Sequence, residues 1–314
     1  MDDQGIVRIP RQIYAVLFVF FLTTMAVVGQ ITILGKQVYD LTGREFDLGL
    51  IGLAEFAPTF ILAPFAGSLA DRMDRRKLLR WAMAGETIVS VLLFLYARSE
   101  PTSVLPIFLL VLTFGICRAF AAPSGRALTI DLAPLAVVPR VVALGSVSMQ
   151  AGLIVGPVIF GFLFVAAEPL PYLASAVALG AGVIILSMVS SSNVRKLETV
   201  GTRRAVKDAF EGFRFIRNTP MLFGAISLDL FAVLFGGAVA LLPAIAEDRL
   251  GVGAVGLGWL RASVGLGAGV VAVTLAIRPL QRHIGRILLV VVAIFGVSTI
   301  VLGLSRNYTV AFIA

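Results

Sequence analysis

Five ionisable side chains stand inside long apolar stretches of this sequence, and they are the residues best suited to chemistry. They are Glu55, Glu86, Arg118, Asp229 and Arg261. A charged group at the centre of an apolar membrane helix costs about 2.5 to 3.5 kcal/mol on insertion scales, so it usually faces the protein interior or a water-filled path. Burial favours a neutral acid, whereas a nearby arginine favours the carboxylate, so a change of surroundings can take up or release a proton. We therefore expect proton or substrate binding at these positions.

The five candidates differ in the roles that they suit. Glu55 and Asp229 are the leading proton or substrate carboxylates, and Arg118 and Arg261 are candidate counter-charges. Glu86 lies nearer the end of its apolar segment, where it could reach the membrane surface. Arg118 could instead pair with Asp131 or Asp71, and each of the five could make only a structural polar contact. The sequence establishes no pairing among them.

The elements that position these residues are long apolar helices. Hydrophobic residues make up 59% of the 314 residues and charged residues 14%, with a mean hydropathy of +0.99. Soluble domains carry about 25% charged residues. The apolar blocks have the length that crosses a bilayer as a helix, about 20 residues. We predict an all-α polytopic membrane protein, with a tenth span that begins near Tyr308. The nine full spans before it are predicted at 13–35, 48–70, 78–97, 104–122, 141–166, 172–191, 220–243, 256–277 and 287–304.

The distribution of positive charge predicts the orientation of these spans. Most of the 26 Lys and Arg residues fall on the segments that are cytoplasmic when the N-terminus is inside. This topology explains the net charge of +8 without nucleic acid as a partner. We expect a multi-pass protein of the cell (inner or plasma) membrane, in contact with lipid and monomeric. The single cysteine and single histidine, Cys117 and His283, provide no ligand set for a Cys/His metal site, and we expect no metal and no cofactor.

A dense group of charges lies between the second and third predicted spans, in the stretch GSLADRMDRRKLL (67–79). Its ionised residues must form a short turn in water, which makes the two flanking helices antiparallel neighbours. Gly67 is expected to let these helices approach closely. A short basic inside loop of any polytopic protein is the alternative interpretation.

The order of residues in this loop resembles the signature loop of the major facilitator superfamily, Gly-x-Leu-Ala-Asp-Arg-x-Gly-Arg-Lys. Asp74 stands where that pattern has glycine. The resemblance implies two pseudo-symmetric bundles of six helices. It also implies that the loop closes the cytoplasmic face by latching the two halves together. By position that role falls on Asp71, Arg72, Arg75 and Arg76. Arg118 occupies a place similar to an arginine often found in the fourth span of the family.

The fifth predicted span carries Gly152, Gly156, Pro157 and Gly161. Glycines four residues apart share one helix face and permit close helix packing, and Pro157 favours a bend. The pattern resembles the Gly-x-x-x-Gly-Pro-x-x-Gly-Gly element of superfamily antiporters, with Phe160 in place of one glycine. This resemblance favours export over import. A generic packing motif is the alternative.

The chain divides into three parts in this interpretation. Residues 1–191 are the N-terminal six-helix bundle, 192–219 a cytoplasmic linker, and 220–314 a partial C-terminal bundle with spans seven to nine and the start of span ten. The linker contains RRAVKDAFEGFRFIR, which is predicted to form an amphipathic basic helix on the membrane surface. Arg282 and Arg286 repeat the positions of Arg72 and Arg76, as expected for parallel repeats. Two full repeats require twelve spans, so we expect the second bundle to be truncated.

Segments of the second, seventh and eighth spans resemble the branch that contains the enterobactin (siderophore) exporter and macrolide and multidrug antiporters. The resemblance implies a proton-coupled exporter of small amphipathic molecules, such as a siderophore or a drug, that works by alternating access. An importer or facilitator of the same fold and an inactive fragment stay open as alternatives. No Ser/His/Asp set, metal cluster or phosphate-binding loop supports an enzyme.

Overall fold

The computed structural model describes residues 9–189, 214–235, 237–278 and 284–314. All regular structure in these ranges is helical, and eight of the described helices are long and apolar enough to cross a membrane. The predicted amphipathic helix of the linker falls mostly outside the described residues. We call the end at which α1 begins the inner end, because the charge pattern predicts it to be cytoplasmic, and the opposite end the outer end.

The first six spans form one bundle. It consists of α1 (Arg11–Thr42), α2 (Glu45–Arg72), α3 (Arg75–Arg98), α4 (Leu105–Leu132), the short 3-10 helix η1 (Leu135–Val137), α5 (Val138–Ala166) and α6 (Leu170–Met188). α1 packs against α5 and α6, α3 against α4 and α6, and α2 against α4. The buried core is mostly aliphatic, with Phe160 and Tyr172 fully enclosed. Side chains on the opposite faces are large, apolar and exposed, as a lipid environment requires.

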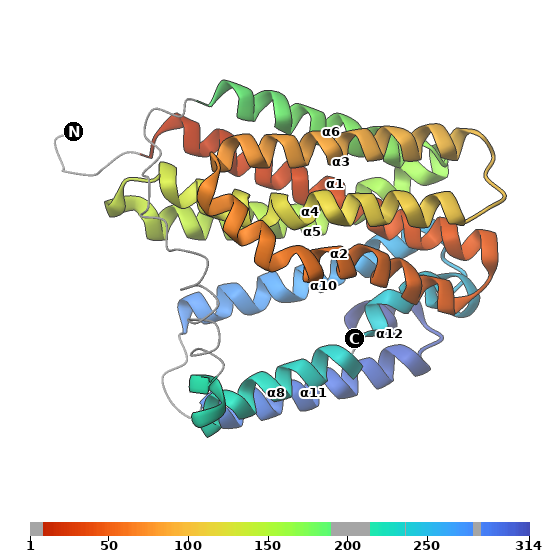
Figure 1. The fold of residues 1–314 in the computed structure, drawn as a ribbon. Helices are drawn as coiled ribbons and strands as arrows, with labels where there is room; N and C mark the ends of the chain where they lie inside the picture. Colours follow the sequence, from red (N-terminus) through yellow and green to blue (C-terminus); the bar gives the residue numbers. More distant parts are fainter. Residues whose placement is uncertain (1–8, 190–213, 236, 279–283) are drawn as a thin grey trace.

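The second half is more open (Figure 1). It contains α8 (Pro220–Phe235), the 3-10 helix η2 (Gly237–Leu241), α9 (Leu242–Ala244), the π-helical turn η3 (Ile245–Arg249), α10 (Gly253–Ile277), α11 (Ile284–Leu304) and α12 (Tyr308–Ile313). α10 packs along α5, and α8 lies beside α11. α5 and α10 therefore form the main contact between the two halves.

Two predicted boundaries differ from the structure. The span expected at 220–243 is interrupted, since α8 ends at Phe235 and is followed by η2. A pair of glycines and Pro243 occupy this region, and both residue types weaken an α-helix. The loop expected between the predicted spans at 104–122 and 141–166 is instead largely helical, because α4 continues to Leu132. Leu128 and Ser124 are fully buried there, so packing within the bundle extends the helix.

The glycines of α5 lie where helices approach most closely. A Cβ atom added to Gly156 would lie 2.5 Å from the carbonyl oxygen of Met25 on α1, and one added to Gly152 would lie 2.7 Å from the Thr24 Cβ. One turn beyond Pro157, a Cβ at Gly161 would lie 2.6 Å from the carbonyl oxygen of Ala254 on α10. α5 thus uses its small residues to contact both α1 of its own half and α10 of the other.

Candidate functional site

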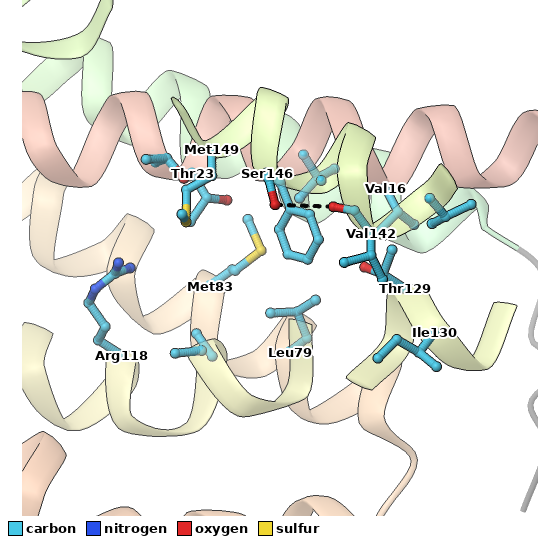
Figure 2. Close-up of a pocket in the computed structure, with 17 residues that line it drawn as sticks. Val16, Thr23, Leu79, Met83, Arg118, Thr129, Ile130, Val142, Ser146 and Met149 are labelled. Carbon is cyan, nitrogen blue, oxygen red and sulfur yellow. Dashed lines mark hydrogen bonds between the residues drawn. The ribbon is translucent and has the colours of Figure 1, made fainter. Parts of the chain in front are cut away.

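A cavity of about 400 Å³ lies in the inner half of the first bundle, between α1, α3, α4 and α5 (Figure 2). Its walls are mainly apolar, with hydroxyl groups from Thr23, Thr24, Thr129 and Ser146. Thr23 Oγ1 is buried without a hydrogen-bond partner in the described part of the chain. The other lining residues are Val16, Val19, Phe20, Leu79, Met83, Arg118, Ala121, Ala122, Ile130, Val141, Val142, Gly145 and Met149. We call this space the inner cavity.

Arg118 is the one charged side chain among the described residues that line the inner cavity. It extends from α4 and lies near Met83, Met149 and Thr23 (Figure 2). Arg118 Nη1 is 4.0 Å from Glu86 Oε1 on α3, at the outer limit of an ion pair and too long for a hydrogen bond. The Arg118 side chain is 28% exposed, and Glu86 is fully buried. Arg118 therefore presents its guanidinium group to the cavity, with Glu86 behind it.

Glu86 lies on α3 with its side chain fully buried. Neither of its carboxylate oxygens has a hydrogen-bond partner among the described residues. One turn along α3, Ser90 Oγ donates to Gln30 Oε1 at 2.8 Å and lies 3.3 Å from Ser175 Oγ on α6. Its complete burial places Glu86 in the bundle core. The membrane surface, the other position expected for Glu86, is not the one observed.

A second cavity, of about 240 Å³, lies between the two halves toward the outer end. Its walls come from α1, α2, η2, α9 and α10, and both Glu55 and Arg261 line it. Arg261 Nη1 donates a hydrogen bond of 3.1 Å to the carbonyl oxygen of Val239. Glu55 interacts electrostatically with Arg261 and with Arg118. This outer cavity thus brings together a predicted carboxylate and a predicted counter-charge from opposite halves.

Asp229 is separated from this group. It is exposed on α8 and lines neither the inner nor the outer cavity. Four of the five predicted charges therefore gather around α2, α3, α4 and α10, and the leading candidate of the seventh span stands apart from them. Its assignment as a coupling carboxylate stays a prediction.

A cluster of charged and polar side chains at the outer end was not predicted from the sequence. Lys36 Nζ lies 2.5 Å from Asp40 Oδ1 on α1 and 3.1 Å from Glu247 Oε2 on η3. Next to it, the hydroxyl group of Tyr39 donates a hydrogen bond to Asp248. These residues, which we call the outer clasp, join the first half to the second. A lysine just beyond the predicted first span with an aspartate four residues later was a detectable signal for an ion pair, but its partner in the second half was not.

The charged loop makes its described contacts within the first half. Asp74 caps α3 by accepting a hydrogen bond of 2.9 Å from the Arg76 amide. Arg75 Nη1 donates to Asp131 Oδ2 on α4 at 2.8 Å. Arg76 Nε donates to the carbonyl oxygen of Leu186 on α6 at 2.7 Å. Asp131 thus pairs with Arg75, not with Arg118. The side chains of Asp71 and Arg72 lie outside what the structure describes, and the latch between the halves stays a prediction.

The close helix approach expected at Gly67 is not observed. A Cβ atom added there would meet no described atom within 4 Å. The physical reason is that α2 packs mainly against α4 and touches α3 little, so the short turn does not bring α2 and α3 together along their length. Among the described residues, no three His, Cys, Asp or Glu side chains gather as metal ligands.

Comparison with known proteins finds transporters. Residues 16–313 match the family described as Major Facilitator Superfamily. The chain is 27% identical over 194 residues to the quinolone resistance protein NorA of Staphylococcus aureus, covering 62% of this chain and 48% of that protein. It is 30% identical over 187 residues to multidrug resistance protein 1 of Bacillus subtilis, covering 58% and 47%. The matched part of the chain therefore spans about half the length of these relatives.

A solved structure supports the same fold. A bacterial homologue of the human lysosomal transporter Spinster, in an inward-facing and unoccupied conformation, aligns with a TM-score of 0.67. The alignment covers 98% of this chain and 71% of that one, at 16% sequence identity. At this identity the likeness concerns the arrangement of helices.

Proposed function

Because this chain belongs to the major facilitator superfamily, we propose that it is a proton-coupled exporter of small amphipathic molecules that works by alternating access. It is a multi-pass membrane protein of a transporter family with drug-efflux relatives. The substrate class proposed is a drug-like compound or a siderophore. The siderophore part rests only on the sequence resemblance.

The observation that carries this proposal is the gathering of charged side chains within the first bundle and at its contact with the second half. The inner cavity holds Arg118, with the buried Glu86 behind it, and the outer cavity holds Glu55 and Arg261 from opposite halves. Buried ionisable groups in a membrane protein are costly and typically mark transport paths. A carboxylate between two halves meets different surroundings whenever the halves move, so its affinity for a proton changes with conformation. Movement and proton binding are then linked at Glu55.

Two further features support export rather than import. The glycine and proline pattern of α5 resembles that of superfamily antiporters and lies at the contacts with α1 and α10. Relatives named for quinolone and multidrug resistance point in the same direction. By contrast, transport by an importer or facilitator of the same fold would be uncoupled from proton movement.

The proposal is tested in inverted membrane vesicles that contain the chain, with the fluorescent quinolone norfloxacin as the probe. We expect accumulation when the vesicle interior is acidic and loss of accumulation when an ionophore removes the pH gradient. Glu55→Gln is expected to lower accumulation at least about tenfold, as loss of an essential ionisable group. Glu45→Gln, an exposed acid at the start of the same helix, is the matched control. Accumulation that ignores the gradient, or that survives in Glu55→Gln, contradicts proton coupling at Glu55.

A further inference from the structure

The guanidinium group of Arg118 is poorly supplied with hydrogen-bond acceptors. Within the described residues, Arg118 has no hydrogen bond, and its carboxylate contact with Glu86 is 4.0 Å long. The comparable arginine of the outer cavity, Arg261, donates to the Val239 carbonyl at 3.1 Å. A guanidinium group has five N–H donors in a planar fork. Arg118 therefore offers the inner cavity N–H donors that no described residue accepts, whereas Arg261 already donates to the backbone.

A planar oxyanion is the chemical group that satisfies such a fork. Arginine binds carboxylates through two parallel hydrogen bonds, and charge-assisted bonds of this kind are about twice as strong as neutral ones. Glu86 cannot supply that geometry from its present position, since its nearer oxygen is 4.0 Å from Arg118 Nη1. A bound anion on the cavity side would reach the guanidinium group without displacing the buried Glu86.

The rest of the inner cavity suits an apolar body attached to that anion. Phe20, Leu79, Met83, Val142 and Met149 contribute most of the larger apolar side chains around it. Methionine side chains adapt to ligands of different shape and contact aromatic rings favourably. The volume of about 400 Å³ lies within the range of roughly 300 to 1,000 Å³ that is usual for small-molecule sites. A second polar group could be met by the unpartnered hydroxyl of Thr23.

We propose that the inner cavity selects amphipathic anions, with a carboxylate bound to Arg118 and an aromatic or aliphatic body against the methionines. This inference rests on the proposed transport function and specifies its substrate class. No described carboxylate lines the inner cavity, so a cationic molecule of the same shape would place its charge beside Arg118 without compensation. A cation is therefore disfavoured at this site.

The test uses a matched pair of radiolabelled probes, 2-naphthoate and 2-naphthamide, which share one shape and differ in charge. Binding to the whole chain in lipid nanodiscs is measured against empty nanodiscs. We expect 2-naphthoate to bind about ten to a hundred times more tightly than the amide, the range for a hydrogen-bonded charge. Arg118→Gln should remove this preference, and Arg118→Lys should retain part of it. Arg98→Gln removes an exposed arginine at the C-terminal end of α3 that does not line the inner cavity. This variant should leave the preference unchanged.

Equal binding of both probes, or a preference that persists in Arg118→Gln, overturns the inference, as does failure of 2-naphthoate to bind. Arg118→Lys keeps the test meaningful if Arg118→Gln does not fold. Norfloxacin accumulation in vesicles reports separately on the proposed function. If transport is proton-driven but the naphthoate preference is absent, the substrate class is wrong and the transport function stands. If neither is seen, both are overturned.

Discussion

Lys36 Nζ on α1 and Glu247 Oε2 on η3 lie 3.1 Å apart, so an ion pair joins the two halves of the protein at the outer end. Lys36 is 8% exposed and Glu247 is 44% exposed. The Tyr39 hydroxyl and Asp248 connect the same two elements. η3 is a π-helical turn, a distortion often found at functional positions. This outer clasp is well placed to hold the outer ends of the halves together.

Weakening the outer clasp should increase the population in which the outer ends separate. Glu247→Gln removes a partly exposed ion pair worth about 0.2 to 1 kcal/mol, so the separated population should rise at most about fivefold. Adding Asp40→Asn should have a larger effect, because the buried Lys36 then lacks both carboxylates.

Spin labels at Phe46→Cys and Arg249→Cys, in a Cys117→Ala background, report the distance between the outer ends. Glu168→Gln, an exposed acid at the same end, should change nothing. An unchanged distance distribution in the double variant would show that the outer clasp does not hold the halves.

Gly156→Ala should destabilise the first bundle. The added methyl group would lie 2.5 Å from the Met25 carbonyl oxygen, which belongs to the backbone of α1 and can move only with the helix. Overpacking of this kind costs about 1 to 3 kcal/mol. The midpoint of thermal unfolding in detergent should therefore fall. On the same helix, Gly145→Ala meets only the Leu17 Cδ2 atom at 3.7 Å, an ordinary contact, and should leave the midpoint unchanged. Equal midpoints for the two variants would contradict the close seam between α1 and α5.

Arg75→Gln should destabilise the inner end of the first bundle. Its partner Asp131 has a side chain that is only 4% exposed, so removal of Arg75 leaves a buried carboxylate with reduced compensation. The cost is about 3 kcal/mol, at the lower end for breaking a buried pair. Lys77→Gln removes an exposed cation from the same loop and should have little effect on thermal unfolding. If both variants unfold alike, the contact between Arg75 and Asp131 does not stabilise the bundle.

The sequence predicted the helices well because apolar length alone determines which segments cross a membrane. Interruptions were harder to place. The α-helix of the seventh span ends at Phe235, and a 3-10 helix and a π-helical turn follow in a region that contains glycine and proline. Pairings between distant charges were beyond the sequence, because the partners are set by how the helices pack. Glu55 and Arg261 were both recognised as candidates, yet only the structure places them in one cavity. Lys36 was missed because it follows directly after the predicted first span, and the exposure of Asp229 could not be read from hydropathy.

The charges of the outer cavity should be energetically coupled. Glu55→Gln leaves Arg261 without the nearby carboxylate, and Arg261→Gln leaves Glu55 without one of its two arginines. Each single variant should therefore be less stable than the parent, and the double variant should be more stable than the sum of the two losses predicts. Coupling energies between interacting residues are about 0.5 to 3 kcal/mol. The measurement is a double-mutant cycle of thermal unfolding in detergent. A parallel cycle that combines Glu55→Gln with Arg98→Gln should be additive, since Arg98 is exposed and lines neither cavity. Additive losses in the first cycle would mean that Glu55 and Arg261 share the cavity without interacting, and the link between the halves at Glu55 would be lost.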